Sequence, residues 1–365
     1  MLVHLVAGAR PNFMKIAPIY RIAQQYPNVT CRIIHTGQHY DYEMSQAFFD
    51  DFGLPEPDHF LHSGSGSHAK QTAKIMIAFE AICETEKPDV VIVVGDVNST
   101  LACSVVAKKM LIPVAHVEAG LRSFDLTMPE EINRMVTDAI SDYFFVTEDS
   151  GVKNLKNEGK PHDRIFLVGH VMIDNLFHQI EQIKRSNASL FASQQLKKRM
   201  GAYAFMTLHR PSNVDKKENF EKIVHAINII STDLEIVFPV HPRTRKMIDR
   251  YGIQFSDRVH LMEPLPFRES LFLWKDARVV LTDSGGLQEE TTALKIPCLT
   301  LRQNTERPIT IEIGSNKLAG TSSHSILEAF QRVMGDTGDD YQVPSMWDGK
   351  AAERIWEVLI KELGR

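Results

Sequence analysis

Cysteine is scarce in this chain, and its distribution argues against disulfides and zinc. Four cysteines occur among 365 residues, and no two of them form a Cys-x-x-Cys pair. Zinc sites and small disulfide-stabilised folds need cysteines at short, regular spacings. We therefore predict four reduced cysteines, as in a cytoplasmic protein: Cys31, Cys83, Cys103 and Cys298.

Long apolar runs and an excess of basic charge are missing too. No run approaches the roughly 18 apolar residues that span a bilayer, and the run at 2–7 is too short for a signal peptide. The formal net charge is -5 and the pI about 6.3. No P-loop motif and no metal-ligand spacing of histidines occurs. We expect a cytoplasmic protein with no membrane partner, no nucleic acid partner and no metal.

What is present is an alternation of strands and helices that occurs twice. At about 150 residues per domain, the length favours two domains. β-branched runs such as 89–94 are typical of parallel strands covered on both faces. We predict an α/β fold with two Rossmann-like, doubly wound domains, 1–168 and 169–350, in which ligands bind beyond the carboxyl ends of the strands. The predicted strands are 2–7, 31–36, 89–94, 114–118, 143–147, 204–208, 235–240, 258–262, 278–283 and 298–301.

Two of the predicted strand ends resemble anion-binding turns. Gly8, Arg10 and Lys15 follow the first strand, and a glycine turn with cations before a helix suits an anionic group. A tight turn with solvated cations explains that motif equally well. The stretch 284–286 (Ser-Gly-Gly) follows the strand at 278–283 and would let backbone N–H groups approach a phosphate. There we favour a ligand site over a merely capped helix, with Glu290 accepting both ribose hydroxyls.

Three carboxylates form a second group at strand ends and helix starts. Asp96 and Glu118 each end a predicted strand, and Glu131 lies in a helix that opens at Pro129. A buried acidic residue is costly unless it is paired, so each one alone indicates a cap or an ion pair. At one sheet edge, however, the set predicts a polar cleft with acid and base groups.

Histidines supply the third group. His209 and Arg210 end the first strand of the second half, and His241 ends the next one. A lone histidine at a strand end is usually structural. The neighbouring cations favour a cationic or proton-transferring wall instead.

Nine motifs in order carry a family resemblance. The chain resembles the non-hydrolysing UDP-N-acetylglucosamine 2-epimerases over essentially its whole length. The motifs are G-x-R-P-x-x-x-K at 8–15, H-T-G-Q-H at 35–39, G-D-V-x-S-T at 95–100, H-V-E-A-G-L-R at 116–122, P-E-E-x-N-R at 129–134, T-x-H-R at 207–210, P-V-H-P at 239–242, T-D-S-G-G-x-Q-E-E at 282–290 and T-E-R-P at 305–308.

The resemblance implies a GT-B fold, in which the nucleotide sugar binds in the cleft between the domains and a last helix, 351–365, completes the first domain. It implies C2 inversion by elimination and re-addition of UDP, through a 2-acetamidoglucal, without a cofactor. It also implies a homodimer that serves the synthesis of bacterial surface polysaccharide precursors. The acid and base groups would be Asp96, Glu118 and Glu131. The departing UDP would be stabilised by Arg10, Lys15 and His209. UDP would be bound by Ser284, Gly285, Gly286, Glu290 and Arg307.

The chain departs from the family pattern at several positions. Near the uracil pocket one aromatic, Phe267, is kept, and Ser270 replaces the second. After His209-Arg210 the family's usual Glu is absent. An allosteric subsite for a second UDP-sugar is implied by Gln38, His39, Glu131, Arg210 and His241, but Asp41 and Lys70 replace a Gln and an Arg there.

Other functions stay open at this point. A hydrolysing 2-epimerase shares the fold but usually lacks Pro11 and Lys15, which are present here. A 2-epimerase of a UDP-2,3-diacetamido uronic acid, a GT-B glycosyltransferase and a non-catalytic sensor of nucleotide sugars are the further alternatives.

Overall fold

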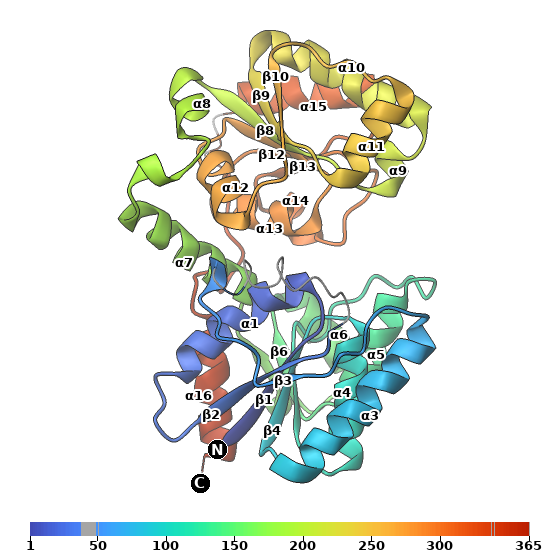
Figure 1. Cartoon of the computed structure of the whole chain (residues 1–365), viewed down its shortest axis with the longest axis vertical. Helices are drawn as coiled ribbons and strands as arrows, with labels where there is room; N and C mark the ends of the chain where they lie inside the picture. The colour runs from blue at the N-terminus through green and yellow to red at the C-terminus, as the bar shows by residue number, and fades with distance from the viewer. Residues whose placement is uncertain (38–48, 50, 337, 339, 365) are drawn as a thin grey trace. The chain divides into compact units, whose positions relative to one another are not determined.

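The computed structural model describes residues 1–37, 49, 51–336, 338 and 340–364. Its contacts divide the chain into two compact units (Figure 1). Unit 1 comprises Met1–His178 and Ser345–Arg365, and unit 2 comprises Gln179–Pro344. The first boundary therefore lies at 178/179, where we expected 168/169.

Unit 1 is built on a seven-stranded parallel sheet with the order β3-β2-β1-β4-β5-β6-β7. The chain runs outward from β1 to β3 and then returns to β4 on the other side of β1. That reversal creates a switch point between β1 and β4, where doubly wound sheets bind ligands. The strands are β1 (Leu2–Ala7), β2 (Thr30–His35), β3 (His59–Phe60), β4 (Val90–Val94), β5 (Val114–Val117), β6 (Tyr143–Val146) and β7 (Ile165–Leu167).

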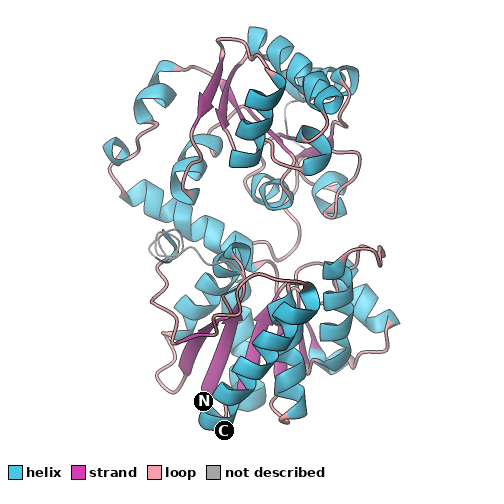
Figure 2. Ribbon diagram, turned by 45° about the vertical axis from the view of Figure 1, so that its right-hand side comes forward, coloured by secondary structure: helices cyan, strands magenta, loops and turns pink. Residues whose placement is uncertain are grey.

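Helices cover both faces of this sheet (Figure 2). The last helix of the chain packs on the first, and the indole Nε1 of Trp356 donates to the carbonyl of Ile19 at 2.8 Å. The amphipathic segment 351–363 therefore completes unit 1. The helices are α1 (Arg10–Ala23), α3 (His68–Glu86), α4 (Asn98–Lys109), α5 (Pro129–Ile140), α6 (Asp149–Asn157), η1 (His162–Arg164), α7 (Val171–Arg185, which the boundary divides) and α16 (Ala351–Leu363).

Unit 2 repeats the design on a six-stranded parallel sheet, order β10-β9-β8-β11-β12-β13. Its switch point lies between β8 and β11. The strands are β8 (Tyr203–Thr207), β9 (Glu235–Pro239), β10 (Val259–Met262), β11 (Val279–Thr282), β12 (Cys298–Thr300) and β13 (Asn316–Leu318). The helices are η2 (Ala188–Leu190), α8 (Gln194–Arg199), α9 (Pro211–Val214), α10 (Lys217–Asp233), α11 (Pro242–Tyr251), α12 (Phe267–Trp274), α13 (Gly285–Ala293), α14 (Pro308–Glu312) and α15 (Ser323–Gly335).

Each sheet has its own apolar core, because its strands are buried on both faces. All five residues of β4 are buried, and two of them, Val91 and Val93, pack in one apolar cluster with Ile75 and Phe79 of α3. In unit 2, Phe238 of β9 packs with Phe220 and Ile227 of α10. Of the helices that the structure describes, none has the length and hydropathy needed to cross a membrane.

The predicted α/β class with two doubly wound sheets is confirmed, with two local differences. The sequence indicated a glycine turn with Arg10 in it before a helix, but α1 already begins at Arg10. The side chain of Asn12 accepts from the backbone N–H groups of Gly8 and Ala9, which anchors the start of the helix. The short edge strands β3, β7 and β13, of two or three residues, were not predicted because so few residues carry no alternation.

Candidate active site

The carboxyl ends of β1, β4 and β5 bring a lysine and two of the predicted carboxylates into one region of unit 1. Lys15, on the second turn of α1, contacts Oε2 of Glu118 through its Nζ. Glu118 directly follows β5, the neighbour of β4. Gly95 lies between them with a φ of +68°, and a Cβ there would lie 2.8 Å from the Nζ of Lys15. A side chain at this position would displace the Lys15 ammonium group, and the positive φ favours glycine there.

Glu118 has an unusual backbone and an unsatisfied side chain. Its φ is +70°, in the left-handed region that non-glycine residues rarely adopt. Such strain persists only where the surroundings impose it, and it concentrates at functional sites. The side chain is 5% exposed, and its Oε1 is buried with no hydrogen-bond partner among the described residues. Glu118 thus has one oxygen held by Lys15 and one buried oxygen whose hydrogen-bonding capacity is unused among the described residues.

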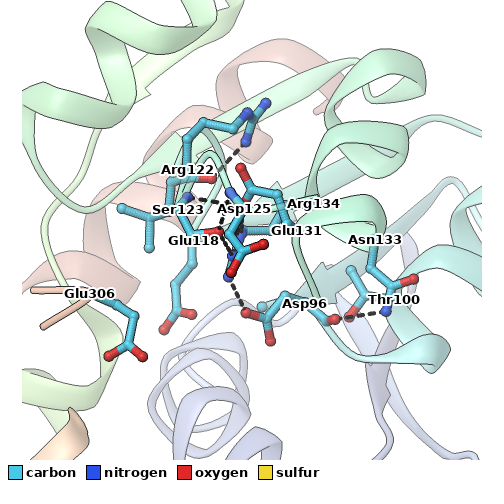
Figure 3. Close-up of polar contacts among 12 residues, drawn as sticks. Asp96, Thr100, Glu118, Arg122, Ser123, Asp125, Glu131, Asn133, Arg134 and Glu306 are labelled. Carbon is cyan, nitrogen blue, oxygen red and sulfur yellow. Dashed lines mark hydrogen bonds and ion pairs between the residues drawn. The ribbon is translucent and has the colours of Figure 1, made fainter. Parts of the chain in front are cut away.

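Arg134 connects the other two predicted carboxylates (Figure 3). Its Nη1 lies 2.5 Å from Oδ2 of Asp96, and its Nη2 lies 2.7 Å from Oε2 of Glu131. Asn133, also on α5, donates to the backbone carbonyl of Asp96 at 2.9 Å. Helix α5 therefore holds both the side chain and the backbone carbonyl of Asp96.

Glu131 has both carboxylate oxygens occupied. The backbone N–H groups of Ser123 and Phe124 each donate to it at 3.0 Å. Burial alone would raise the pKa of Glu131, but these hydrogen bonds and the Arg134 guanidinium lower it below its ordinary value. Glu131 is therefore held as an anion that orders the segment between β5 and α5.

A buried network lies beside these groups. His116, on β5, has Nδ1 2.7 Å from Oδ1 of Asp138 and Nε2 2.9 Å from the carbonyl of Gly95. The ring thus bridges a carboxylate on α5 and a backbone carbonyl after β4. Burial would raise the pKa of Asp138, but His116 and Arg122 lower it. His116 therefore anchors the Gly95 turn that precedes Asp96.

In unit 2, Asp283 organises the end of β8. It is fully buried and accepts from the backbone N–H groups of His209 and Arg210 at 2.9 and 2.8 Å. The Nδ1 of His209 lies 3.0 Å from its Oδ1. Burial would raise the pKa of Asp283, yet the hydrogen bond from His209 and the backbone bonds lower it. Because a carboxylate only accepts, Nδ1 carries a proton, and Nε2 is the nitrogen that can exchange one with a ligand.

A pocket of about 230 Å³ opens at the carboxyl ends of β8, β9 and β11. The ring centroids of His209 and His241 lie 5.5 Å apart in it. Burial lowers the pKa of His241, and the charge of His209 lowers it further. Ser284 lines the pocket and is the N-cap of α13, which begins at Gly285 and Gly286. The lining residues are Thr207, Leu208, His209, Pro239, His241, Pro264, Leu265, Ser270, Ser284 and Leu287.

The remaining residues predicted for UDP lie in the same unit. Glu290 is on α13, where burial and the neighbouring charge of Glu289 raise its pKa to about 8. Arg307 is the N-cap of α14, and its Nε lies 2.5 Å from Oε1 of Glu289. Phe267 opens α12, two residues after the pocket-lining Leu265.

The structure thus brings together Lys15, Glu118 and Asp96 in unit 1, with Glu131 joined to Asp96 through Arg134. Arg10 begins α1, and Lys70 lies on the exposed side of α3. The predicted subsite residues Gln38, His39 and Asp41 lie outside the described residues. The roles assigned to all these residues stay predictions.

Sequence reasoning missed Arg134, His116, Asp138 and Asp283. Arg134 had a local signal, because it lies three residues after Glu131 on one helix and so shares its face. Asp283 ends a buried strand, as Asp96 does, so the same argument could have made it a candidate site residue. His116 and Asp138 are 22 residues apart, and only the fold brings them together.

A family model described as UDP-N-acetylglucosamine 2-epimerase matches residues 21–360. The chain belongs to this epimerase family. The predicted enzyme class, an isomerase, is thereby confirmed. The UDP-N-acetylglucosamine 2-epimerase of Methanocaldococcus jannaschii is 42% identical over 98% of this chain and 99% of its own length. The UDP-2,3-diacetamido-2,3-dideoxy-D-glucuronate 2-epimerase of Pseudomonas aeruginosa is 37% identical over 99% of this chain and 100% of its own.

Solved structures agree with this epimerase assignment. The crystal structure of the Methanocaldococcus jannaschii enzyme in complex with UDP-GlcNAc and UDP has a TM-score of 0.86, at 40% identity over 99% of this chain and 100% of that one. The structure of Phytolacca americana UGT2 has a TM-score of 0.63 at 12% identity, covering 100% of both chains. That likeness concerns the fold alone, and it agrees with the predicted GT-B class.

Proposed function

We propose that this epimerase interconverts UDP-N-acetylglucosamine and UDP-N-acetylmannosamine without net hydrolysis. The observation that carries the proposal is the contact between Lys15 on α1 and Glu118, which follows β5, the strand that pairs with β4 before Asp96. The family and its 42% identical archaeal relative, which carries that name, support the choice of substrate.

The proposed reaction moves one proton and one leaving group in each direction. A carboxylate takes the C2 proton, the C–H electron pair becomes the C1=C2 double bond of 2-acetamidoglucal, and the C1–O electron pair leaves with UDP. UDP then adds back to C1, while a proton reaches the opposite face of C2. We assign the proton transfers to Asp96 and Glu118, whose available oxygens suit general acid–base catalysis. Lys15, Arg10 and His209 would stabilise the charge that develops on UDP.

Glu131 fits this scheme as a positioning residue. Its two oxygens are already engaged by two backbone N–H groups and by Arg134, which also holds Asp96. We propose that unit 2 binds the nucleotide, with the turn 284–286 on the diphosphate, Glu290 on the ribose and Arg307 near the phosphates or the sugar. We also propose that the chain forms a homodimer. Its product would supply precursors of bacterial surface polysaccharide.

One observation favours a second candidate substrate. The Pseudomonas aeruginosa relative named for a UDP-2,3-diacetamido uronate is 37% identical over 99% of this chain. The same elimination chemistry at C2 would serve that sugar.

Proton NMR in D₂O tests the proposal. Purified protein with UDP-N-acetylglucosamine should give UDP-N-acetylmannosamine that carries deuterium at C2, and free N-acetylmannosamine should not accumulate. Accumulation of the free sugar with UDP would instead identify a hydrolysing 2-epimerase. Conversion of only the diacetamido uronate in a substrate panel would overturn the choice of sugar, and product without deuterium would contradict elimination with solvent exchange.

A further inference from the structure

A fully buried glutamine on α13 links two segments of unit 2 to which the proposed function assigns UDP. Gln288 is the fourth residue of α13, and its amide Nε2 donates to the backbone carbonyl of Ser284 at 2.9 Å. Its Oε1 accepts from the hydroxyl of Thr305 at 2.6 Å. One side chain therefore contacts both the turn 284–286 and the loop that leads to Arg307.

The hydroxyl of Thr305 extends this link to the backbone of Arg307. While it donates to Gln288, it accepts from the N–H group of Arg307 at 3.0 Å. A hydroxyl has one proton to donate and lone pairs with which to accept, so it can do both at once. Three hydrogen bonds thus form one chain from the N–H group of Arg307 to the carbonyl of Ser284.

A second path from Gln288 reaches the other backbone group of Arg307. The fully buried Asn316 donates through its Nδ2 to Oε1 of Gln288 at 3.2 Å and to Oγ1 of Thr310 at 3.1 Å. The hydroxyl of Thr310 donates in turn to the carbonyl of Arg307 at 2.7 Å. The Oδ1 of Asn316 accepts from Thr300 at 2.7 Å, which orients the amide. Both backbone groups of Arg307 are therefore connected to Gln288.

Ser284, at the opposite end of the network, is also held through both of its backbone groups. Its N–H group donates to Oγ1 of Thr282 at 2.9 Å, and its carbonyl accepts from Gln288. The Ser284 side chain does not cap α13, so an anion can accept from the first N–H groups of the helix instead. The network therefore fixes the direction in which this turn presents its N–H groups.

Stability alone gives little reason for a buried network of this kind. Replacing both partners of a buried hydrogen bond by apolar groups of the same shape can be nearly neutral. A fully satisfied network instead makes its surroundings rigid and fixes one geometry. Here the rigid parts are the turn 284–286 and the backbone of Arg307, which are far apart in the sequence.

We propose that Gln288, Thr305 and Asn316 are positioning residues that hold the turn 284–286 and Arg307 together as one preformed site for a diphosphate. The inference rests on the proposed function, which assigns the turn and Arg307 to UDP and gives these three residues no contact with it. Charge develops on the diphosphate as UDP leaves C1. Groups that are already oriented stabilise that charge without rearranging, so their alignment matters most in the transition state.

Thr305→Val tests the network by isothermal titration calorimetry. Valine keeps the shape of the side chain and removes the hydroxyl that joins Gln288 to Arg307. UDP should bind at least about tenfold more weakly, and the preference for UDP over UMP should shrink, because the diphosphate no longer meets both segments in one geometry. Thr305→Ser keeps the hydroxyl and should bind UDP as the wild type does. Loss of stability alone would lower the number of sites but not the Kd or the ratio of the two Kd values.

A double-mutant cycle shows whether Thr305 acts through Gln288. Gln288→Met keeps the length of the side chain and removes its hydrogen bonds, so it should also weaken UDP binding. Gln288→Met/Thr305→Val should bind UDP about as weakly as Gln288→Met alone, because members of one network are not additive. Additive losses would show that the two side chains act independently.

Thr291→Val is the matched control for Thr305→Val. The hydroxyl of Thr291 donates to backbone carbonyls of its own helix, at Leu287 and Gln288, so its loss leaves the path to Arg307 intact. This variant should bind UDP as the wild type does. Wild-type affinity in Thr305→Val, an equal loss in Thr305→Ser, or additive losses in the cycle would each overturn the inference and leave the proposed function standing. A wild-type chain that does not bind UDP would overturn both.

Discussion

The Nζ of Lys15 contacts Oε2 of Glu118, while Oε1 of the same carboxylate is buried without a partner among the described residues. The contact fixes the orientation of the carboxylate and leaves its second oxygen without a partner, and the proposed reaction assigns the substrate proton to that oxygen. Glu131 differs, because backbone N–H groups and Arg134 engage both of its oxygens. Two glutamates that look alike in the sequence thus have different environments. That contrast underlies the first two predictions.

Removing the carboxylate from Asp96 or Glu118 should abolish most turnover without unfolding the protein. Asp96→Asn and Glu118→Gln keep the side-chain shape but remove the base, and general acid–base catalysis contributes about 10²–10⁴-fold. We expect each variant to lose at least about 100-fold in kcat. Initial rates together with circular dichroism and thermal unfolding check this. A variant that turns over at the wild-type rate would show that its residue serves only as an ion pair.

Glu131→Gln should slow catalysis through disorder rather than through loss of a base. Ser123 and Phe124 donate to different oxygens of the carboxylate, and the amide has an NH₂ donor in place of one of them, so one of the two hydrogen bonds is lost. We expect at least about a 100-fold fall in kcat, accompanied by faster amide hydrogen exchange at 121–128. Asp96→Asn and Glu118→Gln should leave exchange in that segment unchanged.

Glu130→Gln is the matched control for Glu131→Gln. Glu130 is the exposed neighbour on the same first turn of α5. It should keep both the wild-type rate and the wild-type exchange. Unchanged exchange at 121–128 in Glu131→Gln, with a lost rate, would instead favour direct participation of Glu131 in proton transfer.

The sequence predicted the sheets better than it predicted the contacts of the site. Strands such as 89–94 are continuous β-branched runs, and burial on both faces demands that pattern, so β4 was found within one residue. Asp96 and Glu118 follow strands that neighbour each other in the sheet, so their proximity also followed from the order of the chain. The partners of Glu131 did not follow from the order of the chain, because two of them are backbone N–H groups in the irregular segment between β5 and α5. The His209–Asp283 contact joins residues 74 apart and depends on the pairing of β8 with β11.

The buried carboxyl group of Glu290 should make the stability of unit 2 dependent on pH. Burial and the charge of Glu289 raise its pKa from 4.5 to about 8. Between those values the folded protein holds a proton that the unfolded chain has released, so this group's contribution to stability falls as the pH rises. Glu290→Gln does not titrate. Its melting temperature minus that of the wild type should therefore increase between about pH 5 and about pH 9.

Thermal unfolding across that pH range measures the effect of Glu290→Gln. A difference that stays constant with pH would mean that Glu290 titrates normally. The exposed Glu312→Gln on α14 is a control, since it should leave the pH profile as it is in the wild type.

Gly285→Ala should separate UDP binding from folding. Gly285 is the first residue of α13, its φ lies outside the left-handed region, and an added Cβ would meet no neighbouring atom within 4 Å. Alanine is the better helix former by up to about 1 kcal/mol, so the free energy of unfolding should be unchanged or slightly higher. A phosphate held by the backbone at this helix start would meet the new methyl group. We therefore expect UDP to bind at least about tenfold more weakly, a loss of about 1.4 kcal/mol.

Gly201→Ala, also in unit 2 with nothing within 4 Å of the added Cβ, should bind UDP as the wild type does. Isothermal titration calorimetry with UDP compares the three proteins, and full affinity in Gly285→Ala would place the diphosphate away from the start of α13.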